Sequence, residues 1–375
     1  FPPPTVERIG GYDRVSIPHL DGHCDPGAPV LPFRLAHVLL PPGVTVRAVD
    51  VTAADGVTLE GVYLVEPGQE LVPTESAQGE PLPPDPELYE SRAPYPGEFH
   101  SILSVQRLHG YAILLLRLHP VQYVPGTGEL VYYPEFTVNV ETTVELDRAA
   151  PSRIVAPHGR GRVQALVDNP GMLDSYDAAP FDSGPAATSS LVSAGDPCDY
   201  VVITSQALSA TFKSLVDWKI SKGLAARTYT TEDIYAEYSG DDDAERIRNF
   251  VVDAYTTWAS TPHPLQYVVL GGDTEVIPIR TVYVQYSSYS TWMPVDMYYA
   301  GLDGDWDADG DGSYGEPAST GAAGEEVDFF AEVYVGRMPV ETATEAAYAI
   351  SKSLRYEHNP SAGYLDRSLW LGQKL

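Results

Sequence analysis

The pattern that most restricts the fold begins at Cys198, where short apolar runs start to alternate with helical periodicities. Each apolar run has the length of a buried strand, and each helical stretch repeats its apolar residues every three to four positions. Strands that alternate with helices in this way form a mostly parallel sheet with helices on its faces. We therefore predict an α/β domain over residues 198–375, with strands near 199–204, 224–231, 267–271, 332–337 and 369–372, and helices near 208–223, 243–258 and 342–357.

The first 150 residues follow a different pattern. Short stretches alternate apolar and polar residues between prolines and glycines, as at 44–51, 57–65 and 131–141. Such alternation is typical of strands with one buried face, and the turn residues at 124–129 indicate a hairpin. We predict that residues 1–150 form an all-β sandwich.

Residues 151–197 are predicted to be a linker, because large apolar side chains become scarce, above all between 178 and 190. Three arginines, Arg153, Arg160 and Arg162, precede the stretch most depleted in apolar residues. A processing site and an ordinary exposed tether both fit this composition.

Acidic residues dominate the charge of the chain, with 52 Asp and Glu against 23 Lys and Arg and a formal net charge of −29. Such a chain repels nucleic acid and anionic membranes and attracts divalent cations, and it would also suit a salt-rich habitat. No apolar run approaches the roughly 18 residues that a membrane span needs. The start at Phe-Pro-Pro-Pro, without Met or a signal peptide, indicates a processed or trimmed end.

Residues 303–316 read DGDWDADGDGSYGE and place oxygen-bearing side chains at alternate positions. Gly310 stands at position 6 of a calcium loop, where the chain must turn sharply. Closely spaced carboxylates repel one another unless a cation neutralises them. We therefore predict a Ca²⁺ site here, with a solvated acidic turn as the alternative; positions 1, 3, 5, 7, 9 and 12 are Asp305, Asp307, Asp309, Asp311, Ser313 and Glu316.

This loop is not expected to belong to an EF-hand. Position 8, which is apolar in EF-hands because it packs against a partner loop, is Gly312. Residues 297–302 before the loop are predicted to be a strand, and residues 317–324 after it a flexible loop. The sequence therefore predicts an EF-like loop on a different fold.

The two cysteines, Cys24 and Cys198, leave two interpretations open. A disulfide between them would tie the N-terminal region to the later domain and would be consistent with export. The alternative is two free thiols, one of them buried. Cys24 is not expected to be a nucleophile, because the side chain of its neighbour His23 points to the opposite face of an extended segment.

The later half of the chain resembles the gingipain-type cysteine peptidases, a clan with a caspase-like fold. The resemblance rests, in order, on DYVVIT at 199–204, DWKISKG at 217–223, YVVLGGDTEVIP at 267–278, EVYVGRMPVET at 332–342 and WLGQ at 370–373. The first half resembles the propeptide of the same family, through Leu31-Pro32 and YVPGTGELVYY at 123–133.

This resemblance implies a secreted or cell-surface endopeptidase precursor that acts on proteins and peptides. Its β-rich propeptide would inhibit and chaperone a catalytic segment that continues downstream. The resemblance also implies structural calcium. By position, one family site maps onto Asp328, the carbonyl of Phe330 and Glu332, and a second maps onto Asp273.

The catalytic His-Gly and Cys of the family lie beyond the WLGQ strand, so neither is expected within these 375 residues. We therefore expect a zymogen segment that is inactive as this chain alone. The alternative is a non-catalytic, calcium-stabilised surface or assembly protein that reuses the fold. The sequence downstream of Leu375 would discriminate between them.

Overall fold

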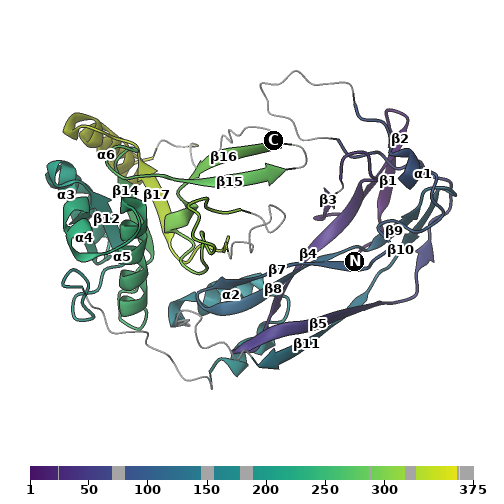
Figure 1. Cartoon of the computed structure of the whole chain (residues 1–375), viewed down its shortest axis with the longest axis horizontal. Helices are drawn as coiled ribbons and strands as arrows, with labels where there is room; N and C mark the ends of the chain where they lie inside the picture. Colours follow the sequence, from purple (N-terminus) through teal and green to yellow (C-terminus); the bar gives the residue numbers. More distant parts are fainter. Residues whose placement is uncertain are drawn as a thin grey trace.

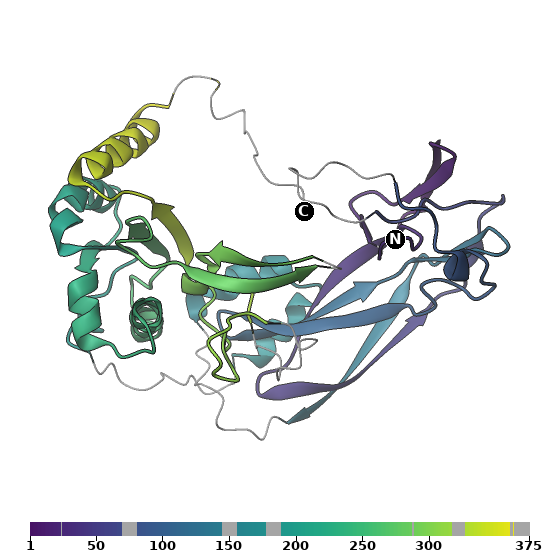
Figure 2. The ribbon, with the colours of Figure 1, turned by 45° about the horizontal axis from the view of Figure 1, so that its top comes forward.

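The computed structural model describes residues 1–23, 25–69, 81–144, 156–177, 189–286, 289–316, 327–360 and 363. The N-terminal part is built from strands, and the C-terminal part from strands and helices (Figure 1). The two parts lie next to each other and meet near α2 and the ends of β7 and β8 (Figures 1 and 2).

The C-terminal part contains a four-stranded sheet in the order β13-β12-β14-β17, in which every pairing is parallel. These strands lie within two residues of the predicted positions. The segment predicted as a strand at 369–372 lies outside the described residues. The four strands are β12 (Tyr200–Thr204), β13 (Ala226–Thr230), β14 (Tyr267–Gly271) and β17 (Tyr334–Met338).

Helices cover both faces of this sheet because its strands are apolar on both sides. Alternate residues of a strand point to opposite faces, so β12 contributes to two cores. Val201 and Ile203 pack on the side of α5 (Asp243–Trp258). Tyr200 and Val202 pack on the side of α3 (Gln206–Ser221) and α6 (Ala343–His358).

Three local features of the C-terminal part differ from the prediction or add to it. Residues 297–302, predicted to be a strand, begin with the 3-10 helix η3 (Met297–Tyr299). The carbonyl groups of Tyr298, Gly301 and Leu302 accept hydrogen bonds from the Arg248 side chain. The additional elements are α4 (Thr231–Glu237) and a hairpin of β15 (Arg280–Tyr286) and β16 (Tyr289–Val295).

In the N-terminal part, two sheets pack face to face, as predicted for a β-sandwich. One has the order β3-β4-β8-β7 and the other pairs β5 with β11. Leu114 and Leu116 of β8 are fully buried between the sheets, against Val51 of β5 and the apolar face of β11. The two sheets comprise β3 (Asp21–His23), β4 (Leu31–Leu39), β5 (Val44–Ala53), β7 (His100–Leu108), β8 (Tyr111–Leu118) and β11 (Phe136–Val144).

Smaller elements complete this part. A ribbon pairs β1 with β2, and a third sheet has the order β6-β10-β9. Their shared core includes Tyr123 and Leu130, both fully buried. The elements are β1 (Thr5–Ile9), β2 (Tyr12–Ser16), β6 (Val57–Thr58), α1 (Pro86–Tyr89), β9 (Val121–Val124) and β10 (Glu129–Tyr132).

Part of the region predicted as a linker is folded. Residues 157–175 form η1 (Pro157–Gly159), α2 (Arg160–Leu166) and η2 (Pro170–Ser175). Apolar side chains of this segment pack on β4, β7 and β8. Asn169 also exchanges two hydrogen bonds with the main chain of Leu39, at 2.7 and 2.9 Å. By packing, α2 and η2 therefore belong to the N-terminal part.

The predicted disulfide is not present in the structure. Cys198 is a buried free thiol at the start of β12, and Cys24 lies outside the described residues. The strand before Cys24, β3, lies in the N-terminal part, whereas β12 is one of the two inner strands of the parallel sheet (Figure 1). The placement of Cys198 in the α/β core accounts for the difference.

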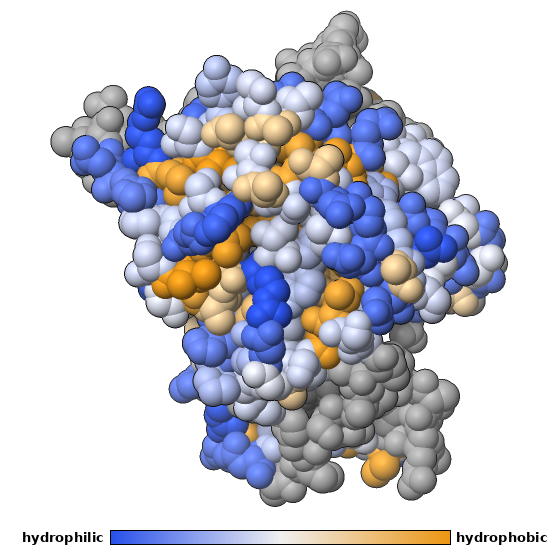
Figure 3. Space-filling view, turned by 90° about the vertical axis from the view of Figure 1, so that its left-hand side faces the viewer, coloured by the Kyte–Doolittle hydropathy of each residue, from blue (hydrophilic) through white to orange (hydrophobic). Residues whose placement is uncertain are grey.

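The outer face of the C-terminal part carries apolar patches interrupted by hydrophilic side chains (Figure 3). Exposed apolar residues on the helices of this part include Ile220 of α3 and Tyr348 of α6. In the part of the chain that the structure describes, no helix has both the length and the apolar character needed to cross a membrane.

Candidate cation-binding site at the junction of the two parts

The acidic loop at 303–316 folds around its glycines and its aspartates. Gly310 and Gly312 have φ angles of 72° and 83°, in the left-handed region that favours glycine. Several carboxylates accept the amide two residues ahead, which is the bonding of Asx turns. These pairs are Asp305 with Asp307 N (3.1 Å), Asp309 with Asp311 N (3.2 Å) and Asp311 with Ser313 N (2.7 Å).

Three of the predicted calcium ligands come together. Asp307, Asp309 and Asp311 each offer a carboxylate oxygen, and these three oxygens lie within 4.8 Å of one another. Asp305 and Glu316 are outside this group, although both belong to the loop. Hard oxygen donors at this separation suit Ca²⁺, which accepts six to eight such ligands. The structure thus gathers the middle of the predicted ligand set.

The loop is anchored to the α/β core by aromatic side chains. Trp306 is buried in the same cluster as Tyr298. The Arg280 guanidinium lies 3.6 Å from the ring centre of Tyr314 and 4.5 Å from that of Tyr298. Arg280 also binds the carboxylate of Asp242 with two nitrogens, at 2.7 and 2.8 Å. Because Asp242 caps α5, the loop is tied to the start of that helix.

Arg248 organises the chain that enters the loop. It projects from α5 into the interior and donates hydrogen bonds to the carbonyl groups of Tyr298, Gly301 and Leu302. Burial lowers the pKa of Arg248, while nearby carboxylates such as Glu332 and Asp303 raise it. Guanidinium remains protonated in proteins, so Arg248 acts as a fixed internal cation.

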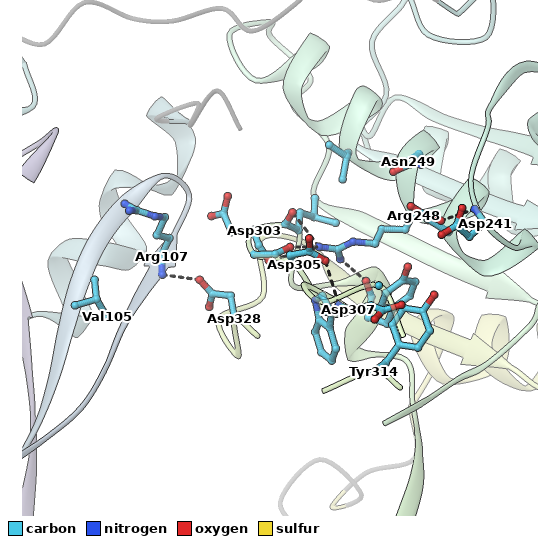
Figure 4. Close-up of a pocket in the computed structure, with 17 residues that line it drawn as sticks. Val105, Arg107, Asp241, Arg248, Asn249, Asp303, Asp305, Asp307, Tyr314 and Asp328 are labelled. Atoms are coloured by element: carbon cyan, nitrogen blue, oxygen red, sulfur yellow. Dashed lines mark hydrogen bonds between the residues drawn. The ribbon is translucent and has the colours of Figure 1, made fainter. Parts of the chain in front are cut away.

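A cavity of about 520 Å³ lies where the loop, α5 and the N-terminal part meet (Figure 4). Its walls are strongly acidic, which fits attraction of cations. Arg107 lines it from β7, and Asn249 lines it from α5. The acidic side chains that line it are Asp241, Glu245, Asp303, Asp305, Asp307 and Asp328.

Two further predicted ligands, Asp328 and Glu332, are buried beside this cavity, with 5% and 3% of their surface exposed. Burial raises the pKa of Asp328 to about 7, opposed by hydrogen bonds from main-chain amides and assisted by the charge of Asp303. Burial and the charge of Asp303 also raise the pKa of Glu332 well above its usual range. A cation beside these groups would remove this penalty.

Asp328 and Glu332 offer the oxygen donors that hard cations prefer, although among the described residues they are not part of a group of three metal-compatible side chains. The hydrogen bonds that the two carboxylates accept come from main-chain amides, namely those of Arg107, Phe330, His109 and Leu302. The carbonyls of Asp328 and Phe330 both face Gly301, where an added Cβ would lie 2.7 and 3.6 Å from their oxygens.

Asp273 lies elsewhere, at the carboxyl end of β14. Its carboxylate accepts the amide of Glu275 at 3.0 Å, and its carbonyl accepts Arg337 at 3.1 Å. Among the described residues it is not part of a group of three metal-compatible side chains. The second family calcium site therefore stays a prediction.

Within the described residues, cysteine and histidine do not form a catalytic pair at the carboxyl edge of the sheet. Cys198 lies at the opposite, amino edge, and burial raises the pKa of its thiol, which disfavours the thiolate. His263 is at the same amino edge, 3.0 Å from the Asp199 carboxylate. His358 stacks on Trp218 with ring centres 3.7 Å apart.

Several residues of this site were not identified from the sequence: Arg107, His109, Arg248 and Asp303. Arg248 carried one usable signal, because it stands beside Ile247 on the apolar side of a predicted helix. A charged residue at such a position is buried only with partners. Arg107 and His109 carried no signal, since they act through main-chain amides.

Comparison with known proteins places both parts of the chain in one family. Peptidase family C25 matches residues 193–374, and the propeptide of C25 matches residues 6–153. The chain therefore belongs to the gingipain-type cysteine peptidases and carries the propeptide region of a precursor.

Relatives include gingipain R2 of Porphyromonas gingivalis, 24% identical over 284 residues, which are 75% of this chain and 31% of the relative. Gingipain R1 of the same organism is 23% identical over 287 residues, which are 76% of this chain and 24% of the relative. The chain thus spans less than a third of the length of these relatives.

Partial structural overlaps occur with two solved structures. The complex of the pro- and mature domains of RgpB from P. gingivalis has a TM-score of 0.37 and 17% identity, covering 45% of this chain and 86% of that chain. Dimeric latent PorU from P. gingivalis has a TM-score of 0.34 and 18% identity, covering 71% of this chain and 22% of that chain.

Proposed function

We propose that this chain is the propeptide and the first part of the catalytic domain of an exported gingipain-like endopeptidase, a zymogen stabilised by Ca²⁺. The observation that carries the proposal is the order of the two family matches, with the propeptide at 6–153 followed by the peptidase at 193–374. The parallel sheet would be the first part of a caspase-like catalytic domain. A proteolytic function follows from the family, and proteins or peptides would be the substrates.

The proposed domain division is a propeptide over 1–150, a connecting region over 151–197 and the catalytic part from 198 onward. By sequence α2 lies in the connecting region, but we group it with the propeptide because its apolar side chains pack on β4, β7 and β8. The chemistry would be attack of a cysteine thiolate on a peptide carbonyl, assisted by histidine. Both groups would come from the segment downstream, which is also the proposed partner of the propeptide.

Calcium would serve structure rather than catalysis. The proposed ligands are those of the 305–316 loop together with Asp328, the Phe330 carbonyl and Glu332. Ca²⁺ would supply positive charge to carboxylates that are otherwise crowded or buried. Support comes from the cluster of Asp307, Asp309 and Asp311 and from the raised pKa of Asp328 and Glu332.

The peptidase proposal is tested on the full-length precursor after removal of the propeptide. We expect hydrolysis of unstructured protein substrates, and we expect iodoacetamide to abolish it. The Cys198→Ala variant is the control, and its activity should remain sensitive to iodoacetamide because Cys198 is a buried core thiol.

A full-length protein that neither cleaves protein nor contains a reactive cysteine would contradict the peptidase proposal. That outcome would instead favour a non-catalytic, calcium-stabilised surface or assembly protein built on the same fold.

A further inference from the structure

The hairpin turn between β7 and β8 contacts the C-terminal part of the molecule through main-chain amides. It is a two-residue turn of His109 and Gly110, with φ angles of 54° and 80°. Positive φ at both central residues is the pattern of a type I′ turn, which matches the twist of the strands on either side. The geometry presents the amides of Arg107 and His109 to the C-terminal part.

Each of these amides meets one buried carboxylate. The amide of Arg107 donates to Asp328 at 2.6 Å (Figure 4), and the amide of His109 donates to Glu332 at 3.3 Å. The other oxygen of each carboxylate accepts an amide within the C-terminal part, that of Phe330 at 2.8 Å and that of Leu302 at 2.6 Å. The turn therefore covers the two acids that the proposed buried calcium would use.

The side chain of His109 is held from both sides. Its Nδ1 lies 2.7 Å from the Tyr255 hydroxyl of α5, and its Nε2 lies 3.1 Å from a guanidinium nitrogen of Arg162 on α2. Because Arg162 can only donate, Nε2 accepts and Nδ1 carries the proton. Arg162 also donates to the carbonyl of Ala331, between the two acids, at 3.2 Å.

We infer that the β7–β8 turn is the lid of the cation site at Asp328 and Glu332, so that Ca²⁺ binding and docking of the N-terminal part strengthen each other. The physical reason lies in desolvation. The docked turn buries two carboxylates that are costly to ionise without a cation, and its amides orient and stabilise their charged form. If docking of the N-terminal part increases the affinity for the cation by some factor, the bound cation must increase the affinity of docking by the same factor. This inference rests on the proposed calcium site.

The direct test measures amide hydrogen exchange of residues 105–111 in the whole 375-residue chain, after EDTA treatment and again with saturating CaCl₂. We expect exchange of this segment to slow by about fivefold or more with calcium, the lower end of typical coupling between sites. Asp309→Asn should keep this response, because it alters only the loop at 305–316.

The matched variant is Asp328→Asn combined with Glu332→Gln. Each amide side chain keeps one of the two acceptor oxygens and replaces the other with an NH₂ donor, so this variant is compared with itself, with and without calcium, rather than with wild type. Its calcium response should disappear, and calorimetric titration should show one fewer calcium bound. Tyr255→Phe removes a partner of His109 without touching a carboxylate, and it should weaken calcium binding at this site by severalfold.

Two results overturn the inference and are distinguishable from each other. If calcium binding is unchanged in the double variant, the buried cation site itself is wrong. If one calcium is lost but exchange of residues 105–111 never responds to calcium, the site stands and the coupling is wrong. Neither result bears on the peptidase proposal, which the iodoacetamide experiment decides.

Discussion

At the scale of single residues, Arg248 supports the stretch of chain that leads into the acidic loop. It brings a buried positive charge to a bend in the chain and donates to the carbonyl groups of Tyr298, Gly301 and Leu302. A buried carbonyl without a partner costs about 1–3 kcal/mol. Arg248 thus stabilises the bend at residues 297–302, directly before the acidic loop.

Replacing this arginine should strongly destabilise the folded chain. For Arg248→Met we expect the free energy of unfolding to fall by about 3 kcal/mol or more, since at least three carbonyls lose their donor. Urea denaturation would measure the change. The control is Arg246→Met, two residues earlier on α5. Arg246 pairs with Asp243 at a partly exposed position, so its loss should cost about 0.5 kcal/mol or less. Equal stability of the two variants would contradict the assigned role.

At the scale of elements, α6 is fastened to α3 by Glu357. Its carboxylate accepts Trp218 Nε1 at 2.8 Å, Lys219 Nζ at 2.6 Å and Lys222 Nζ at 3.0 Å. Burial acts to raise the pKa of Glu357, but these donors outweigh it and lower the pKa to about 2. The folded state therefore favours the ionised carboxylate.

The contribution of Glu357 should depend on pH with a defined sign. It is fully present above the unfolded pKa of about 4.3 and is lost as the pH falls toward about 2. At pH 7 we expect Glu357→Gln to lower the free energy of unfolding by about 1–2 kcal/mol, and at pH 2 we expect most of this difference to be lost. Denaturant titrations at the two pH values measure this.

Asp217→Asn is the comparison for this prediction. The pair of Asp217 with Lys213 is exposed, so its loss should matter little at either pH. A Glu357→Gln effect that does not change between pH 7 and pH 2 would count against the ionic role.

An element was predictable from the sequence where its own apolar residues recur at the spacing of a helix or a strand. The recurrence of Ile247, Phe250, Val251 and Ala254 predicted α5, and all four are buried. The helix is capped by Asp242, one of three consecutive aspartates, so the sequence alone does not single out the capping residue. The segment 157–175 escaped prediction since its helix is short and its core is supplied by β4, β7 and β8.

The gathering of carboxylates in the acidic loop was predictable from the sequence, but the packing of the N-terminal part on Asp328 and Glu332 was not. Alternate oxygen side chains and Gly310 indicated the loop, and three of its carboxylates do gather. The spacing could not show that Asp305 turns its oxygen to the amide of Asp307. Nor could it show that a hairpin more than 200 residues away covers Asp328, because contacts between distant segments leave no local period.

At the scale of the whole molecule, stability should depend on calcium. Saturation at about 100 times the dissociation constant adds about 2.7 kcal/mol, and about 1 kcal/mol shifts the melting temperature of domains of this size by about 2–4 °C. We expect EDTA to lower the melting temperature by about 5–10 °C. Differential scanning calorimetry with and without CaCl₂ measures the shift.

Variants of the loop separate the two proposed sites in the same experiment. Asp307→Asn combined with Asp309→Asn should remove part of the EDTA effect and leave the part due to Asp328 and Glu332. If EDTA does not change the melting temperature of the wild-type chain, structural calcium is rejected both at the 305–316 loop and at Asp328 and Glu332.

The β7–β8 hairpin donates main-chain amides to Asp328 and Glu332. This affects which substitutions the hairpin can tolerate. Any residue that keeps position 107 extended leaves its donor in place, so that contact imposes almost no choice of side chain there. Position 109 is more restricted, because it requires a left-handed backbone and its side chain contacts Tyr255 and Arg162. Related chains could therefore have different residues at position 107 and still form the same contact.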